Sequence, residues 1–397
     1  MSLPTRTVEV QFRPAIWEDV TPYLLAPASV QRGAVRVDSP IIRYEPGKAT
    51  IRLNNSDRRF DPTHLSGPHT FLGETHVLPM KPIRLRAEWD SVTYDLFRGF
   101  VDQWDVSWFE PNYSITTVPA TDAFKVLRNR KRSAVTPVGA GEDSGARVTR
   151  ILDSVGWSAG LRLISTGDST LQATTLEGDA LDELQAVAES EIGELFVDAA
   201  GQVRFRNRRA TLTESRSNTV QFTFGGSPGS PQPYTARLNT DDATLWNEVR
   251  AQRVGGTEQV VGDTASQTAF LPRTFPKNNL LVQTDTETRD WAGWILYVSK
   301  NPEVRFDSIE IHAHADPDTL FPVVLGGEIG DRIKIIKHPP GGGFQIEGEL
   351  FIRGISHDIQ QATWITTWYL QSAAKYGSFL VLGHVDLGRL NMNALAY

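Results

Sequence analysis

The segment from Gly225 to Gly229, Gly-Gly-Ser-Pro-Gly, has the G-x-S-x-G spacing of a hydrolase nucleophile elbow. In such an elbow the serine lies on a tight turn between a strand and a helix, and the backbone N–H that follows it helps to bind the oxyanion. Here Pro228 follows the serine and has no backbone N–H, and no strand-turn-helix pattern surrounds the segment. We therefore predict no catalytic residue in this segment.

Three side chains have the types and the spacing of a metal site. His312, His314 and Asp316 occupy alternate positions, so in a strand all three would lie on one face, and imidazole and carboxylate groups are common zinc ligands. Asp318 follows two positions later. Paired histidines in a strand more often face solvent than bind a metal. The three residues are the weak metal candidates of this sequence, and we predict no metal and no other cofactor.

Acidic residues gather in the middle of the chain, at Glu183, Glu189, Glu191 and Glu194. A glycosidase needs only two carboxylates at a suitable separation. These four lie on the polar side of a predicted helix and just beyond it, where solvation explains them without a reaction. The sequence also lacks an H-E-x-x-H zinc motif, a phosphate-binding loop and a dinucleotide fingerprint. We therefore predict that the protein is not an enzyme, with a cell-wall hydrolase as the least favoured alternative.

Ten tryptophans suggest a second alternative, a module that binds carbohydrate or a receptor by stacking on aromatic rings. Trp104, Trp108, Trp364 and Trp368 lie at even spacing within predicted strands. At such positions, packing in a core or an interface is the stronger interpretation.

Composition excludes several classes of protein. The chain has 397 residues, a formal net charge of −7 and no cysteine, so it has neither disulfides nor thiolate metal sites. The negative charge argues against broad nucleic-acid binding. No apolar run approaches the roughly 20 residues that span a bilayer, and the N-terminus lacks the apolar core of a signal peptide. We expect the chain to be made in the cytoplasm.

The first 127 residues are predicted to form an antiparallel β-barrel with an irregular N-terminal arm. Apolar and polar residues alternate over short stretches such as 49–53 and 83–89, with polar turns between them. Several strands at this spacing are typical of a barrel or a sandwich.

Residues 128–224 are predicted to hold a linker and a small α+β domain. The linker starts with the basic run Arg-Asn-Arg-Lys-Arg at 128–132, which we expect to be solvated. Apolar residues at helical spacing predict helices at 146–155 and 179–192, and alternation predicts a hairpin at 194–207.

Residues 225–376 are predicted to form a second β-barrel, with a helix at 287–299 where tryptophan and aliphatic residues recur at helical spacing. Residues 377–397 are expected to be a C-terminal tail. The predicted fold class is therefore mainly β, with two related antiparallel β-barrel domains flanking a small α+β domain.

The two predicted barrels repeat the same landmarks in the same order. The matching segments are 49–53 with 307–311, 83–86 with 333–336, 96–100 with 350–355, and 115–117 with 365–367. Arg98-Gly99 and Arg353-Gly354 are the clearest landmarks, because a glycine within a strand usually marks a bulge or a barrel corner. Self-similarity of this kind constrains the architecture more than any short motif does.

The order of barrel, small α+β insertion and second barrel resembles the tail hub, or baseplate hub, proteins of tailed bacteriophages, which include tail-associated proteins of siphophages. Within that group the chain resembles the minor tail proteins of phages that infect actinobacteria. The residues that carry the resemblance are 49–62, 79–106, 183–208, 245–256 and 330–359. Each segment is only moderately specific, and it is their order that makes the case.

The resemblance implies a structural virion protein at the tail tip, assembled in the host cytoplasm. Such hubs form a homotrimeric ring in which three chains with two barrels each present six similar faces to a sixfold tail tube. The implied partners are tail tube and distal tail proteins on one side and tip or fibre proteins on the other. DNA would pass through the lumen of the ring without specific binding.

Overall fold

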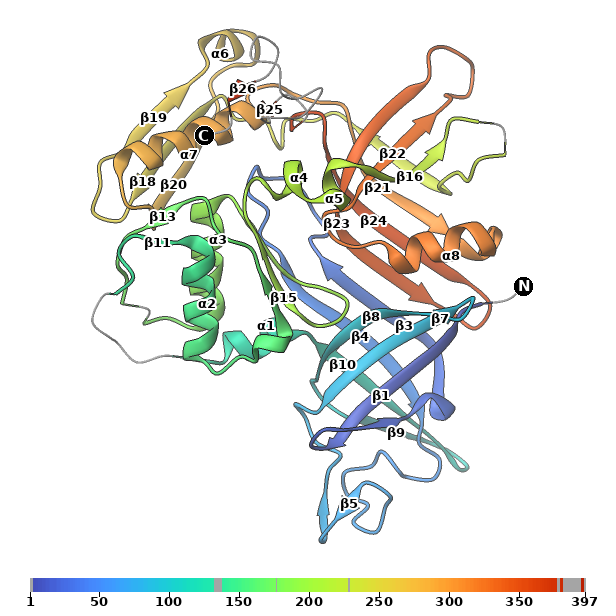
Figure 1. Cartoon of the computed structure of the whole chain (residues 1–397). Helices are drawn as coiled ribbons and strands as arrows, with labels where there is room; N and C mark the ends of the chain where they lie inside the picture. The colour runs from blue at the N-terminus through green and yellow to red at the C-terminus, as the bar shows by residue number, and fades with distance from the viewer. Residues whose placement is uncertain are drawn as a thin grey trace.

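A fourteen-stranded, mainly antiparallel sheet dominates the computed structural model of the chain (Figure 1). The structure describes residues 3–131, 138–175, 177–227 and 229–376, together with the backbone of two short paired strands, β25 (Phe379–Leu380) and β26 (Ala394–Leu395). Pro228, Arg132 of the basic linker and most of the predicted tail therefore lie outside the described residues. Among the residues that are described, no helix combines the length and the apolar character that crossing a membrane requires.

The strands of the first barrel follow from the alternation in the sequence. In β7, Ile83, Leu85 and Ala87 are buried, whereas the arginines between them are partly exposed. The long strands are β1 (Thr5–Arg13), β2 (Ile16–Asp19), β3 (Leu24–Gly33), β4 (Glu45–Asn54), β7 (Pro82–Trp89), β8 (Val92–Val101), β9 (Asp105–Phe109) and β10 (Tyr113–Thr121). The loop between β4 and β7 carries a small hairpin of β5 (Thr70–Phe71) and β6 (Glu74–Thr75).

The second barrel forms from the other end of the chain. Its elements are β16 (Val220–Gly225), β17 (Thr235–Asn239), β21 (Arg305–His312), α8 (Pro317–Gly326), β22 (Arg332–Lys337), β23 (Ile346–Ile359) and β24 (Trp364–Ser372). Phe321 of α8 packs between the two barrels, with its ring 4.8 Å from Trp89 of β7 and 5.9 Å from Trp364 of β24.

The two barrels share one hydrogen-bonded sheet through β3. This strand pairs with β4 of its own barrel on one side and with β23 of the second barrel on the other. The path of the sheet is β17-β21-β24-β23-β3-β4-β10-β8-β7-β1-β2, with β22, β16 and β9 paired off this path. A single hydrophobic core runs through both barrels as a result, from Val8 to Leu370.

The prediction of two related barrels is confirmed by the order of their strands. In the first barrel the neighbours are β4-β10-β8-β7, and in the second they are β21-β24-β23-β22. The register agrees as well. Thr117 lies opposite Arg52, and Thr367, its counterpart in the repeat, lies opposite Glu310, the counterpart of Arg52. The chance resemblance of short strands therefore does not explain the repeat.

The middle of the chain forms a small α+β unit with its own core. Its elements are α1 (Ala123–Arg128), β11 (Glu142–Asp143), α2 (Ser144–Ser154), β12 (Arg162–Ile164), β13 (Thr170–Leu171), α3 (Ala180–Glu191), β14 (Glu194–Val197) and β15 (Val203–Arg206), followed by the short helices α4 (Ala210–Thr213) and α5 (Ser215–Asn218). Side-chain caps from Asp143 and Asp179 start α2 and α3. The β14 strand of the β14–β15 hairpin contacts β3 and β4 of the first barrel.

Residues 245–300 differ from the prediction that placed them within the second barrel. They form a separate three-stranded sheet of β18 (Glu248–Arg253), β19 (Gln259–Gly262) and β20 (Thr274–Leu280), with α6 (Thr264–Phe270) and α7 (Asp285–Ser299). Val249 and Ala251 of β18 are buried in a separate core with Trp291 and Ile295 of α7. Alternation in the sequence predicts a strand, but it does not say which sheet the strand joins.

Candidate functional site

Two of the three metal candidates, His312 and His314, have hydrogen-bond partners within the protein. His312 hydrogen-bonds Glu310 at 2.7 Å and stacks on Tyr234 with 3.9 Å between ring centroids. His314 lies in a short 3-10 helix that follows β21, and its Nδ1 is 3.3 Å from the backbone of Trp364. Asp316 precedes α8. Across the described residues, no group of three or more metal-ligating side chains converges.

The G-x-S-x-G segment follows the end of β16, at Gly225. The next element is another strand, β17, rather than a helix. The described residues therefore do not place Ser227 on a strand-turn-helix elbow, and Pro228, on which the sequence argument rested, lies outside them.

The expectation that the central carboxylates are solvated is wrong for two of the four. Glu191 is fully buried at the end of α3, and the side chain of Glu194 is only 12% exposed at the start of β14. The helical pattern predicted a polar face, but tertiary packing brings that end of the helix against other polar groups. Glu189 is paired with Lys277 of β20, and Glu183 accepts a hydrogen bond from Gly178.

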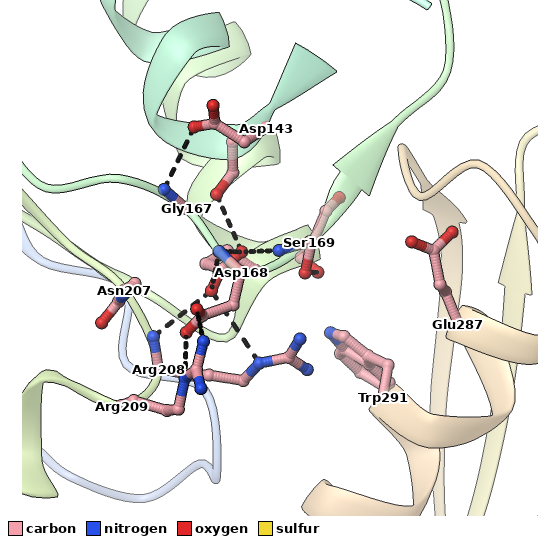
Figure 2. A network of polar contacts seen from close by, with 12 residues as sticks. Asp143, Gly167, Asp168, Ser169, Asn207, Arg208, Arg209, Glu287 and Trp291 are labelled. Carbon is pink, nitrogen blue, oxygen red and sulfur yellow. Dashed lines mark hydrogen bonds and ion pairs between the residues drawn. The ribbon is translucent and has the colours of Figure 1, made fainter. Parts of the chain in front are cut away.

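Glu191 is the acceptor at the centre of a polar network within the α+β unit. Its Oε2 accepts hydrogen bonds from Ser144 Oγ at 2.8 Å and from the backbone N–H of Ser169 at 2.7 Å, while the N–H groups of Asp168 and Arg208 point at the same carboxylate. Figure 2 shows Asp168, Ser169 and Arg208 of this network close together. The carboxylate thus joins the N-terminus of α2, the 165–169 loop and the end of β15.

Replacing Glu191 by glutamine is expected to lower the free energy of unfolding by about 1–3 kcal/mol, because the amide nitrogen would face a buried donor and leave it unpaired. Urea unfolding measures the change. Asp182→Asn on the exposed side of the same helix is the matched control and should cost less than about 1 kcal/mol. Equal losses in the two variants would contradict a special role for Glu191.

A second network lies where the α+β unit meets the two barrels. Glu194 of β14 forms ion pairs with Arg353 of β23 and with Arg206 of β15, the latter at 2.7 Å. Burial by itself would raise the pKa of Glu194, but the charges of Arg353 and Arg206 outweigh it and hold that pKa below its ordinary value. The carboxylate is therefore ionised at neutral pH.

The two arginines of the repeated Arg-Gly landmark contact the same hairpin from different barrels. Arg353 of the second barrel binds Glu194 at the start of the hairpin. Arg98 of the first barrel packs its aliphatic stem against Gly201 in the turn of the hairpin. A Cβ added to Gly201 would lie 2.8 Å from the Cβ of Arg98. The sequence singled these arginines out as landmarks only. The structure brings both to the β14–β15 hairpin, which lies between the barrels and the rest of the α+β unit (Figure 1).

The glycines of the landmark permit close approach of backbones. A Cβ on Gly99 would lie 2.5 Å from the carbonyl oxygen of Thr121, and a Cβ on Gly354 would lie 2.3 Å from that of Ala34. The ladder between β23 and β24 also shifts register between Ile352 and Gly354, which is the irregularity that a glycine within a strand predicted.

A third contact, between Arg32 and Glu328, had no signal in the sequence. Arg32 of β3 forms a 2.7 Å ion pair with Glu328, and the other oxygen of Glu328 accepts the backbone N–H of Ala199 in the turn of the hairpin. Burial opposes ionisation of Glu328, but the charge of Arg32 lowers its pKa below the ordinary value. The hairpin is therefore bound at its start and at its turn, which fixes the α+β unit against the junction of the barrels.

The four tryptophans that were predicted to lie in strands have different surroundings, and Trp104 lies between β8 and β9 rather than in a strand. Trp364 and Trp368 are buried in the core, as the prediction of packing requires. Trp104 is partly buried and donates its N–H to the carbonyl of Leu78 at 2.9 Å. Trp108 in β9 is 66% exposed, beside Phe109 and Tyr113, which are also exposed. Core packing therefore does not explain Trp108.

Two solved structures share this architecture over nearly the whole chain. The 43 kDa tail protein of prophage MuSo2 from Shewanella oneidensis has a TM-score of 0.58 and 13% identity, and the match covers 93% of this chain and 99% of that one. The tail protein from Neisseria meningitidis MC58 has a TM-score of 0.59 and 10% identity, covering 93% and 97%. No protein-family model and no curated protein sequence matches the chain.

At these identities the similarity concerns the fold. It agrees with the resemblance to phage tail hub proteins that the order of sequence segments predicted, and the chain therefore has the fold of these two tail proteins.

Proposed function

We propose that the protein is a structural tail hub protein of a tailed bacteriophage, without enzymatic activity, located at the tail tip and assembled in the host cytoplasm. The observation that carries the proposal is the pair of repeated barrels, β4-β10-β8-β7 and β21-β24-β23-β22, joined in one sheet. The fold is shared with the tail proteins of prophage MuSo2 and of Neisseria meningitidis. A chain with two equivalent units suits a junction between parts of different symmetry.

The proposed assembly is a homotrimeric ring. Three chains with two barrels each provide six similar positions, which match a sixfold tail tube. A closed ring with head-to-tail contacts needs two different complementary edges on each unit, and two diverged barrels can supply them. The rigid attachment of the α+β unit through Glu194, Arg353 and Glu328 would keep its position constant around such a ring.

The proposed lumen lining is the outer face of the shared sheet. Paired positions across its middle strands carry polar side chains, and the two charged ones have opposite signs: Glu310, Thr367, Ser356, Gln31, Lys48 and Thr121. DNA binding needs clustered lysine and arginine, which this row does not have. Such a surface would allow DNA to pass without specific binding.

The partners in this proposal are tail tube and distal tail proteins on one side of the ring and tip or fibre proteins on the other. Native mass spectrometry of the full chain, alone and with tube protein, tests the ring, and negative-stain images test for an axial hole. A trimer with a central opening is the expected result. Monomers under every condition would overturn the proposal.

A further inference from the structure

Four strands of the large sheet have a free edge in the described part of the chain: β2, β9, β16 and β17. Two of them, β17 and β9, correspond to the strands that join the two barrels within the chain. β17 ends the path of the sheet and pairs only with β21, and β9 pairs only with β10. Three of the five residues of β17 and four of the five residues of β9 are exposed. An exposed edge offers unpaired N–H and C=O groups to another strand.

β17 is the counterpart of β3 in the second barrel. β3 pairs antiparallel with β4, the first strand of the repeat, and β17 pairs antiparallel with β21, the counterpart of β4. Ser29 lies opposite Thr50, and Arg237 lies opposite Ser308, the counterpart of Thr50 in the sequence repeat. Arg237 therefore corresponds to Ser29.

β9 is the counterpart of the C-terminal half of β23. Both pair, in the same register, with the strand that carries the repeated segment Ile-Thr-Thr, which is residues 115–117 in the first barrel and 365–367 in the second. The pairs are Asp105–Thr117 and Ser107–Ile115 in the first barrel, and Ser356–Thr367 and Asp358–Ile365 in the second. Ser107 therefore corresponds to Asp358.

Within the chain, the two barrels are joined by the pairing of β3 with this half of β23, where Ser29 lies opposite Asp358. We propose that β17 of one copy pairs antiparallel with β9 of the next copy in the same way, with Arg237 opposite Ser107. The occupant of both free edges is thus a second copy of this chain. The inference rests on the proposed ring and assigns its subunit interface.

The side chains on these edges support the assignment. On the side of the sheet that faces the core, Val30 and Ile359 are 1% and 2% exposed at the joint within the chain. Their counterparts, Leu238 and Trp108, are 45% and 66% exposed. Pairing of β17 with β9 of the next copy would bury both, and this accounts for the tryptophan that the core does not use.

Charge is complementary across the proposed contact. In antiparallel register with Arg237 opposite Ser107, Asp105 lies two residues along β9 and is a diagonal neighbour of Arg237. Both residues are exposed in the single chain. The contact is head-to-tail, because each barrel offers one edge to the previous barrel and a different edge to the following one, and such contacts close into rings.

Engineered cysteines test the register directly, because the natural chain has no cysteine. Residues directly opposite each other in antiparallel strands have Cβ atoms about 4.5–5.5 Å apart, close to disulfide geometry. The full chain with Ser107→Cys and Arg237→Cys is expected to give covalent trimers on mild oxidation, seen on non-reducing gels. Each single variant should give no species above a dimer, and the control pair Leu72→Cys with Arg237→Cys should give no covalent trimers.

The substitutions Trp108→Ala and Leu238→Ser provide a second measurement. Each is expected to raise the protein concentration at which rings form by about tenfold or more, as measured by native mass spectrometry over a range of concentrations. The thermal unfolding midpoint of the monomer should not change. Leu72→Ala, at a fully exposed leucine away from both edges, is the matched control and should leave assembly unchanged.

The outcomes separate the interface from the function. If the parent forms rings but the cysteine pair does not cross-link and Trp108→Ala assembles normally, the assigned interface is wrong while the proposed ring stands. If the parent remains monomeric under every condition, the proposed function and the interface both fail.

Discussion

Replacing Gly354 by alanine is expected to lower the free energy of unfolding by about 3 kcal/mol or more. The added Cβ would lie 2.3 Å from the carbonyl oxygen and 2.9 Å from the carbonyl carbon of Ala34, and both are backbone atoms that cannot turn aside. Overpacking of this kind forces backbone shifts, which typically cost about 1–3 kcal/mol and occasionally more.

Gly354 also lies at the joint between the barrels, which raises the expected effect. It pairs with Gly33, which has φ +82° and whose own Cβ would lie 2.4 Å from the carbonyl oxygen of Arg353. A shift at this point disturbs the only backbone pairing between the barrels in the described residues, β3 with β23. Denaturant unfolding, followed by intrinsic tryptophan fluorescence, measures the loss.

Gly293→Ala is the matched control for this prediction. Gly293 lies within α7, and no heavy atom lies within 4 Å of the Cβ that alanine would add. Alanine is a better helix former than glycine, so this variant is expected to gain about 0.5–1 kcal/mol. If Gly354→Ala unfolds within about 0.5 kcal/mol of the parent, the backbones at the joint are not as tightly packed as described.

The second large effect is expected from Arg353→Met. Arg353 is 1% exposed and forms an ion pair with Glu194, which the substitution would leave with Arg206 alone. Removing one partner of a buried ion pair typically costs about 3–5 kcal/mol, because the remaining charge stays buried. Urea unfolding at neutral pH measures it. Arg98→Met, at the corresponding and partly exposed arginine of the first barrel, should cost less than about 1 kcal/mol.

Unfolding measurements at acidic pH distinguish whether Arg353→Met destabilises the protein through loss of the ion pair or through loss of packing. Because the pKa of Glu194 is below its ordinary value in the folded protein, the stabilisation that it provides is present at neutral pH and is lost as the pH falls through that lowered pKa. The difference in stability between the parent and the variant is therefore expected to shrink in acid. A difference independent of pH would assign the effect to packing.

Local patterns predicted most of the elements and the relation between the two barrels. The helices at 180–191 and 285–299 start at an aspartate cap and a threonine capping box, and their apolar residues recur at helical spacing. Strand alternation and the ordered landmarks predicted two barrels with the same strand order. These signals are local, so they can be read without knowledge of what each element packs against.

Contacts between distant segments could not be predicted in the same way. Arg206 alternates with buried residues in β15 and therefore reads as a solvated residue, yet it is 2% exposed because Glu194, Ser217 and the loop at Gly330 close over it. Arg32 and Glu328 are 296 positions apart, and nothing near either residue indicates the other. Trp108 and Trp368 occupy similar strand positions, and only the fold shows that one is exposed.

The sequence by itself therefore determined the class of the fold and the repeated order of strands in the two barrels, because periodicity and order along the chain encode them. Only the tertiary structure decided that β3 joins the barrels into one sheet, that residues 245–300 leave the second barrel, and that Glu191 is buried while Glu194 is only 12% exposed. The physical reason is that strand pairing and ion pairing depend on which surfaces meet, and a strand's own residues specify its two faces but not its neighbours.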